Sequence, residues 1–174
     1  LLSDRPIFAP ELGIYSHRIG DTWLAGGASN CGGKTLLQFF SQDQLTSLES
    51  SLDPAQLTGT DYYPLPSVGE RFPVSDSKLA PRLTPRPADD AQFLQGIYEA
   101  FARVEQTGFA KLTALGGPTL RNVRHAGGGS RSAAWMSLRA SALGVPQLPA
   151  WSEEAAAGAA RLAWRSLGHE IAFT

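Results

Sequence analysis

The sequence contains a single cysteine, Cys31. One cysteine excludes an internal disulfide, and it also excludes a zinc site built from several cysteines. The three histidines, His17, His125 and His169, lie far apart and lack the spacing of metal ligands. We therefore expect no metal site built by this chain. We also expect a reducing compartment, most simply the cytoplasm.

An excess of charge and a long apolar run are also missing. Fifteen Lys and Arg residues stand against sixteen Asp and Glu residues, so the formal net charge is -1. This balance provides no long-range attraction for a polyanion, and without an apolar run of about eighteen residues there is no transmembrane helix. We expect neither nucleic acid nor a membrane as partner. Because the chain starts at Leu1 without methionine, we expect it to be part of a longer protein.

Glycine and proline are plentiful, with 18 and 12 residues, and they predict many turns. Residues 13–18 and 22–25 form a predicted hairpin around the turn pair Gly20-Asp21. Residues 53–87 are rich in proline, but their aromatic and aliphatic side chains need burial. We therefore expect that segment to be packed on the surface as an irregular excursion.

Apolar spacing predicts several helices. Ser29 or Asn30 is expected to cap a helix through residue 40, and a Ser41–Gln44 capping box begins a second short helix. The longest helix is expected from Asp89 or Asp90 to Leu115. Strands at 120–126 and 145–148 then alternate with helices, the last at 153–167 and capped by Ser152, which predicts an α/β fold. Gly158 inside the last helix predicts close packing of that helix.

The glycine-rich turn at residues 127–132 leads from a strand into a helix. Free backbone N–H groups and the positive end of the helix dipole suit a phosphate there. The turn matches neither the Walker A spacing nor the dinucleotide-binding fingerprint. Trp135 is placed to stack on a planar base, and Ser132 offers a polar group beside it. The alternative is a tight turn with Trp135 in the core.

Gly26 to Gly33 form a second glycine-rich segment, which is suited to line a ligand with backbone. Lys34 either faces a phosphate there or is a solvated helix residue, and the second is favoured. Cys31 is expected to be a packed side chain because nothing in the sequence lowers its pKa. His125 is expected to be a hydrogen-bonded polar residue rather than a base. Glu70 and Arg71 are expected to form an ion pair.

Five stretches of the chain, in order, resemble the C-terminal domain of the FGGY carbohydrate kinases. They are Trp23 to Gly33, Tyr63 to Pro73 with its Gly-Glu-Arg-Phe-Pro, Gly127 to Trp135, Leu143-Gly144-Val145-Pro146, and Glu153 to Ala160. Within the family, two sequence motifs are most similar to those of D-ribulose kinases and xylulokinase-like proteins. They are Gly-Gly-Ala-Ser-Asn-Cys-Gly-Gly and Asp-Tyr-Tyr-Pro-Leu-Pro. The resemblance covers nearly the whole chain.

The resemblance implies the fold of the actin-like ATPases, here a partial RNase-H-like α/β lobe whose sheet is flanked by helices. Residues 1–174 would be the C-terminal domain, without its first strands and without the N-terminal sugar-binding lobe. ATP and Mg²⁺ would lie in the cleft between the lobes. Gly127, Gly128 and Gly129 would pass the α-phosphate and ribose. Ser132 would lie near the base and Trp135 would stack on it. Gly32 or Gly33 would line the nucleotide from the other side, and Leu45 would close the pocket.

No aspartate of this chain matches the catalytic base of the family. Asp4 and Asp21 are expected to be a loop residue and a turn residue. That base would lie upstream of Leu1. The intact protein would transfer the γ-phosphate of ATP to a ketopentose of the D-ribulose or D-xylulose class, which the missing lobe would bind. The isolated chain would be inactive.

The alternative function is a non-catalytic nucleotide-binding or interaction module that associates through an exposed sheet edge. The presence of the missing aspartate in an upstream part of the protein would favour the kinase, and a natural start near Leu1 would favour the module. A Rossmann-type binder is disfavoured because its glycine pattern is absent.

Overall fold

The computed structural model describes residues 1–169, so residues 170–174 of the predicted domain lie outside it. The chain begins with a small antiparallel sheet. Strands β2 (Tyr15–Ile19) and β3 (Thr22–Gly26) form the predicted hairpin, with Gly20 and Asp21 in its turn. A short strand that was not predicted, β1 (Leu2–Ser3), pairs with the other edge of β3 and gives the order β1-β3-β2. A 3₁₀ turn, η1 (Pro10–Leu12), precedes the hairpin.

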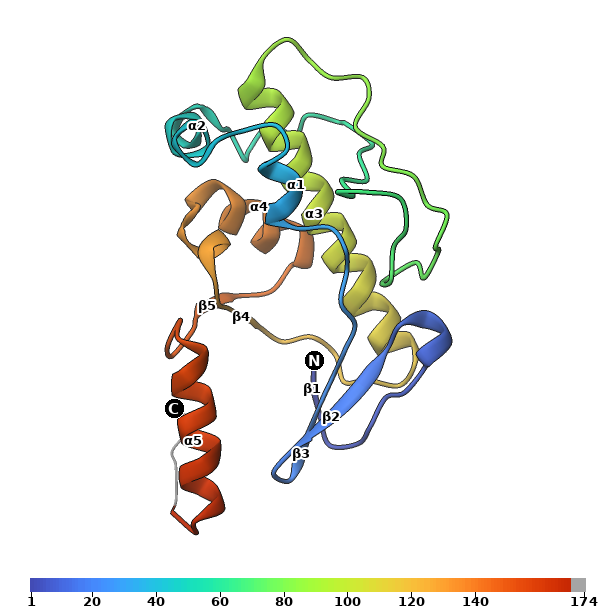
Figure 1. Cartoon of the computed structure of the whole chain (residues 1–174), viewed down its shortest axis with the longest axis vertical. Helices are drawn as coiled ribbons and strands as arrows, with labels where there is room; N and C mark the ends of the chain where they lie inside the picture. The colour runs from blue at the N-terminus through green and yellow to red at the C-terminus, as the bar shows by residue number, and fades with distance from the viewer. Residues whose placement is uncertain (170–174) are drawn as a thin grey trace.

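Helix α3 (Asp90–Ala114) is the longest element and crosses the molecule, with the hairpin near its end (Figure 1). Its N-cap is Asp89, whose carboxylate accepts a hydrogen bond from Ala91 N at 2.9 Å. The helix ends just before Gly116, which has φ +89°. The predicted long helix and its start are confirmed.

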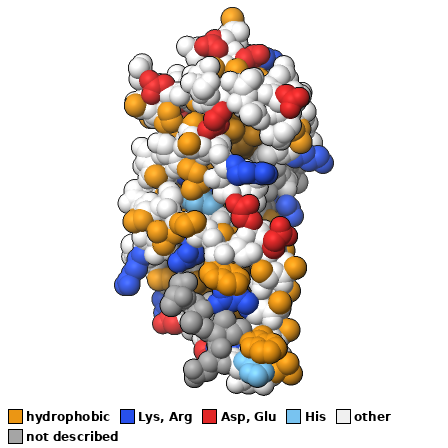
Figure 2. All heavy atoms as spheres, turned by 90° about the vertical axis from the view of Figure 1, so that its left-hand side faces the viewer, with side chains coloured by type: hydrophobic (Ala, Val, Ile, Leu, Met, Phe, Trp, Pro, Cys, Tyr) orange, Lys and Arg blue, Asp and Glu red, His pale blue; other side chains and the backbone are white. Residues whose placement is uncertain are grey.

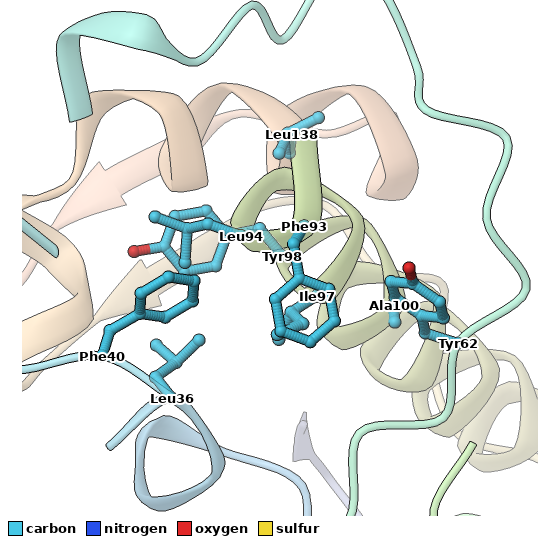
Figure 3. Close-up of a cluster of buried hydrophobic side chains, with 9 residues drawn as sticks. All are labelled: Leu36, Phe40, Tyr62, Phe93, Leu94, Ile97, Tyr98, Ala100 and Leu138. Atoms are coloured by element: carbon cyan, nitrogen blue, oxygen red, sulfur yellow. The ribbon is translucent and has the colours of Figure 1, made fainter. Parts of the chain in front are cut away.

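The main core surrounds the first half of α3 (Figure 3). Phe93 lies at its centre, edge-on to the rings of Phe39 at 5.2 Å and Tyr62 at 5.8 Å between centroids. The buried members of the cluster come from α3, from the segment around α1, from the proline-rich segment and from α4; they are Leu36, Phe40, Tyr62, Phe93, Leu94, Ile97, Tyr98, Ala100 and Leu138. The predicted apolar face of α3 therefore forms this core.

The proline-rich segment, residues 53–87, contains no helix or regular strand and runs along α3 (Figure 1). Tyr62, Leu65 and Phe72 are buried, whereas Val74 is exposed. Two isolated bridges, Tyr63 with Arg82 and Glu70 with Asp76, hold its turns. The prediction of a packed, irregular excursion is confirmed.

Two short helices follow the hairpin. Helix α1 (Gly33–Leu36) begins after Gly32, so the predicted cap at Ser29 or Asn30 is wrong. The side chains of Ser29 and Asn30 bond instead to the segment around Glu70. Helix α2 (Gln42–Leu48) carries the predicted capping box of Ser41 and Gln44, and the 3₁₀ turn η2 (Glu49–Ser51) extends it.

Strands β4 (Val123–His125) and β5 (Gln147–Pro149) pair in parallel. The 3₁₀ turn η3 (Gly128–Arg131) and helix α4 (Ala133–Leu143) connect them, and α4 packs beside α3. The alternation of strand and helix confirms the α/β prediction. Within residues 1–169 this parallel sheet has only two strands.

Helix α5 (Ala155–Ser166) extends beyond the rest of the molecule (Figure 1). It begins after Glu154, two residues beyond the predicted cap, and none of its residues is buried. A Cβ at Gly158 would meet no atom within 4 Å, so the predicted close packing there is wrong. Figure 2 faces this side of the molecule and shows apolar side chains at its surface. The exposed large apolar side chains of α5 and of the segments before and after it are Trp151, Leu162, Trp164 and Leu167. No helix within residues 1–169 is long and apolar enough to cross a membrane.

Candidate functional site

One broad cleft, with a volume of about 1220 Å³, lies between the glycine-rich loop before α1 and the start of α4. Side chains of α2, η2 and α3 form its floor and sides. The cleft brings together all the residues that the sequence proposed for a nucleotide except Gly127; they are Gly32, Gly33, Leu45, Gly128, Gly129, Ser132 and Trp135. Gly127 stands just outside this lining, at the start of the same turn.

The turn after β4 presents backbone to the cleft. Gly127 has φ +98°, in the left-handed region that favours glycine. The Ser130 hydroxyl donates a hydrogen bond to the carbonyl oxygen of Gly127 at 2.7 Å and closes the turn. A Cβ at Gly128 would meet only the Arg131 guanidinium, at 3.6 Å. Glycine is therefore required by conformation at Gly127, while the Gly128 position leaves room in the cleft.

Ser132 caps α4, and a carboxylate that the sequence analysis missed lies against it. The Ser132 hydroxyl accepts a hydrogen bond from Trp135 N at 3.0 Å and donates to Glu49, whose two oxygens lie 2.9 and 2.8 Å away. Glu49 also accepts from Ala134 N at 3.0 Å. The positive end of the α4 dipole therefore already has an anionic partner. No local pattern in the sequence links η2 to α4, because this contact is purely tertiary.

Trp135 both lines the cleft and packs on the core. Its ring centroid lies 5.5 Å from that of Tyr98 and 5.9 Å from that of Phe101, both on α3. The guanidinium carbon of Arg139 lies 5.2 Å from the ring centroid. The side chain is partly buried. The two interpretations that the sequence left open, a base-stacking face and a core residue, are therefore compatible in one side chain.

Arg139 joins α4 to α3 and to the parallel strands. Its guanidinium pairs with the Glu105 carboxylate, with Nε 2.6 Å from Oε2, and donates to Nδ1 of His125. Because arginine only donates, His125 Nδ1 accepts and its Nε2 donates to Gln147 Oε1 at 2.6 Å. His125 is only 4% exposed, and burial, followed by the charge of Arg139, lowers its pKa. It is a neutral, fully bonded residue outside the lining of the cleft.

The opposite wall of the cleft is the loop at residues 26–33, and Glu70 holds it. Glu70 accepts hydrogen bonds from the Ser29 hydroxyl at 2.7 Å and from Asn30 N at 2.6 Å. Arg71 donates to Glu70 through its backbone N at 2.9 Å, while its side chain donates to Asn30 Oδ1 at 2.7 Å. The expected ion pair between Glu70 and Arg71 is therefore wrong. The guanidinium bonds to the neutral amide of Asn30.

Cys31 in this wall and Lys34 just after it behave as the sequence suggested. Burial, with the neighbouring charge of Glu70, raises the pKa of the Cys31 thiol to about 12. The thiol is therefore protonated at neutral pH and is a poor nucleophile. Lys34 is exposed and does not line the cleft. The structure favours the solvated interpretation of Lys34.

The acidic side chains of the cleft are already engaged by the protein. Glu49 bonds to Ser132 and Ala134 N, and Glu105 pairs with Arg139. Over residues 1–169, no three His, Cys, Asp or Glu side chains are grouped to hold a metal ion. These residues therefore do not make a ligand set for a divalent cation by themselves.

Comparison with known proteins matches residues 3–167 to the model of the FGGY family of carbohydrate kinases, C-terminal domain. A xyloylose kinase from Brucella ovis superposes with a TM-score of 0.77 at 25% identity, covering 97% of this chain. A gluconate kinase from Lactobacillus acidophilus gives 0.75 at 17% identity over 98% of this chain. A xylulose kinase from Bifidobacterium adolescentis gives 0.70 at 22% identity over 97%.

The matched region is only part of each of those proteins. It covers 37% of the Brucella protein, 37% of the Lactobacillus protein and 35% of the Bifidobacterium protein. This chain therefore spans little more than a third of the length of the kinases to which it is similar.

Proposed function

Since this chain belongs to the FGGY family of carbohydrate kinases, through their C-terminal domain, we propose that it forms the ATP-binding lobe of a sugar kinase. Its fold is that of the family, the α/β fold of the actin-like ATPases. Sugar kinases of this family use ATP.

One observation carries the proposal. Two segments about 100 residues apart, the loop leading into α1 and the turn leading into α4, face each other across one cleft. Both walls are glycine-rich, and a Cβ at Gly32 or Gly33 would meet no atom within 4 Å. A ligand can therefore approach the backbone closely on either side. Trp135 adds a flat aromatic face between them, which suits a purine base.

We assign the nucleotide a direction in the cleft. The base and ribose lie by Ser132 and Trp135, with Leu45 closing that end and Gly127 to Gly129 passing the ribose and α-phosphate. Gly32 and Gly33 line the nucleotide from the other side. The carboxylate of Glu49 beside Ser132 supports this direction, because phosphates placed there would meet like charge.

The reaction proposed for the longer protein is transfer of the γ-phosphate of ATP to a hydroxyl of a ketopentose, of the D-ribulose or D-xylulose class. The similarity to a xyloylose kinase at 25% identity supports that sugar class. Phosphoryl transfer relies on positioning and on neutralising charge, and Mg²⁺ supplies much of that neutralisation when bound. Because the acids of this cleft are engaged, we assign neither Mg²⁺ ligands nor a general base to this chain and expect it to be inactive alone.

Calorimetric titration of the chain with ADP and with ATP plus Mg²⁺ tests the proposal. We expect saturable binding that Trp135→Ala weakens by about tenfold, since an aromatic stacking face contributes about 1–3 kcal/mol per base. Trp135→Phe, which keeps an aromatic face, is expected to retain most of the affinity. The matched control is Trp164→Ala, because Trp164 is 55% exposed on α5 and does not line the cleft.

Absence of binding by a chain shown to be folded would overturn the proposal. If Trp135→Ala and Trp164→Ala weakened nucleotide binding equally, the nucleotide would not bind in this cleft. A melting curve of each variant accompanies the titration, because Trp135 also packs on the core.

A second candidate function is a non-catalytic interaction module. Two observations favour it. Within residues 1–169 the parallel sheet has only two strands, whereas parallel sheets are normally covered on both faces, so another chain could complete it. Apolar side chains are also exposed on and around α5. Sedimentation of the chain over a range of concentrations distinguishes the two functions when combined with the titration. Self-association without nucleotide binding would favour the module.

A further inference from the structure

Glu70 is a buried carboxylate, 3% exposed, in the proline-rich segment. Its Oε1 accepts hydrogen bonds from three backbone N–H groups, those of Asn30 at 2.6 Å, Arg71 at 2.9 Å and Phe72 at 3.4 Å. Its Oε2 accepts from the Ser29 hydroxyl at 2.7 Å, the Tyr63 hydroxyl at 3.2 Å and the Cys31 thiol at 3.6 Å. All six groups are donors. Glu70 therefore connects two segments of the chain, residues 29–31 and residues 63–72.

The loop that Glu70 contacts is not held by regular secondary structure. Within residues 1–169, residues 27–31 make no backbone-to-backbone hydrogen bond. Their polar contacts go through side chains: the Ser29 hydroxyl accepts from Cys31 N at 3.0 Å, and Asn30 Nδ2 donates to Gly69 O at 2.8 Å. Such a loop has high conformational entropy unless tertiary contacts restrict it.

The same loop is a wall of the cleft, which its residues Gly26, Gly27, Ser29, Cys31, Gly32 and Gly33 line. The loop is also pressed against its support, because a Cβ at Gly27 would lie 2.4 Å from Phe72 Cγ and 2.7 Å from Gly13 O. The shape of this wall is therefore set by its contacts with Glu70 and with Phe72, of which only Phe72 also lines the cleft. A ligand that contacts this wall binds more tightly when the loop is already ordered, because less conformational entropy is lost on binding.

We propose that Glu70 is the positioning residue of the nucleotide site, which holds the loop at residues 26–33 in the shape that binds the nucleotide. The proposal rests on the proposed function. Glu70 acts through Ser29, Asn30 and Cys31 and does not itself line the cleft. Without Glu70, the wall loses its hydrogen bonds to this carboxylate. The loop must then lose conformational entropy when the nucleotide binds, which lowers the affinity for the nucleotide.

The chain contains a matched control in Glu99, another buried carboxylate, 5% exposed. Glu99 accepts from Thr58 N at 2.9 Å, the Thr58 hydroxyl at 2.6 Å and Gln95 Nε2 at 3.2 Å. It also anchors an irregular loop, but neither Glu99 nor Thr58 lines the cleft. Removal of either carboxylate leaves buried donors unpaired and costs about 1–3 kcal/mol per group.

The first measurement is hydrogen–deuterium exchange of the full chain without nucleotide. We expect Glu70→Ala to speed exchange of the backbone amides of residues 27–33 and to leave the amides near Thr58 unchanged. We expect Glu99→Ala to speed exchange of the amides near Thr58 and to leave those of residues 27–33 unchanged. If the exchange of residues 27–33 is the same in Glu70→Ala and in the unmodified chain, the proposal is wrong.

The second measurement is calorimetry with ADP on the same variants. We expect Glu70→Ala to weaken ADP binding by about tenfold, as the loop must now be ordered on binding, and Glu99→Ala to leave it unchanged. Glu70→Gln is expected to restore affinity to within about threefold, because its amide oxygen still accepts from the backbone N–H groups and its NH₂ can donate to the hydroxyls. Equal weakening by Glu70→Ala and Glu99→Ala would reveal a general loss of stability and would overturn the proposal.

A milder pair covers the case in which Glu70→Ala does not fold. Ser29→Ala removes one hydroxyl bond to Glu70, and Thr58→Ala removes the corresponding bond to Glu99. We expect only Ser29→Ala to speed exchange at residues 27–33 and to weaken ADP binding. If the unmodified chain binds no ADP, the proposed function fails, whereas the exchange data still decide separately whether Glu70 holds the loop.

Discussion

Glu49 and Ser132 lie 83 positions apart in the sequence and meet at the N-terminus of α4, where the Ser132 hydroxyl is 2.8 and 2.9 Å from the two carboxylate oxygens. Ser132 at the same time caps the helix by accepting from Trp135 N. The helix end that the sequence offered to a phosphate is thus shared with a carboxylate of the chain itself. Phosphates are expected further along the cleft, away from this charge.

The first prediction follows from that charge. Glu49→Gln keeps the hydrogen-bonding shape and removes the negative charge, so adenosine and ADP should change in affinity by the same factor if only the base and ribose lie near Glu49. If phosphates lie there instead, removal of like charge would favour ADP over adenosine by about tenfold, the equivalent of about 1.4 kcal/mol. Competition calorimetry with both ligands measures the ratio. Glu49→Gln is also expected to destabilise the fold by about 1 kcal/mol through the weaker cap of α4.

A second prediction separates binding from folding at Gly33. A Cβ there meets no atom within 4 Å, and the residue starts α1, so Gly33→Ala should leave the free energy of unfolding unchanged or slightly higher. The added methyl group projects from a wall of the cleft and should weaken ADP binding several-fold, by roughly 1 kcal/mol.

Gly158→Ala is the control for Gly33→Ala. It also meets no atom within 4 Å, but it lies on α5, away from the cleft. It should raise the free energy of unfolding by about 0.5–1 kcal/mol, because alanine is the better helix former, and leave ADP binding unchanged. Unchanged ADP affinity in Gly33→Ala would argue against this wall as part of the nucleotide site.

A third prediction concerns acid sensitivity at His125. Burial and the guanidinium of Arg139 lower its pKa in the folded state from the ordinary value of 6.5. Below pH 6.5 the unfolded chain therefore takes up a proton at this residue that the folded chain resists, and the free energy of unfolding falls as the pH falls towards the folded pKa. The groups that face the imidazole are Arg139, paired with Glu105, and Gln147.

His125→Gln, which keeps an acceptor for Arg139 but cannot be protonated, should show a smaller loss of stability between pH 7 and about pH 5.5. Urea unfolding at several pH values measures the slope. His17→Gln, at an exposed position on β2, is the control for the loss of a histidine side chain. An identical slope in His125→Gln and the unmodified chain would contradict the prediction.

Local signals in the sequence were sufficient for most of the secondary structure. The spacing of apolar residues from Phe93 to Val104 and the carboxylate of Asp89 define α3 and its start, because both act within a few turns of one helix. The capping box of Ser41 and Gln44 and the Gly20-Asp21 hairpin turn are equally local. Where a local rule failed, as at Ser29 and Asn30, the side chain had bonded to a distant partner, Glu70 for Ser29 and the carbonyl oxygen of Gly69 for Asn30.

The sequence by itself therefore determined the α/β character of the chain, its family resemblance and the glycine-rich segments of the candidate site. The tertiary structure alone decided which segments face each other across the cleft. It also decided that Glu49 binds the start of α4 and that Glu70 holds the loop at residues 26–33 rather than pairing with Arg71. Such contacts join residues tens of positions apart, and no periodicity or capping rule encodes them. They form only in the folded chain, where tertiary packing brings hydrogen-bond donors to the buried carboxylate of Glu70 and to the half-buried carboxylate of Glu49.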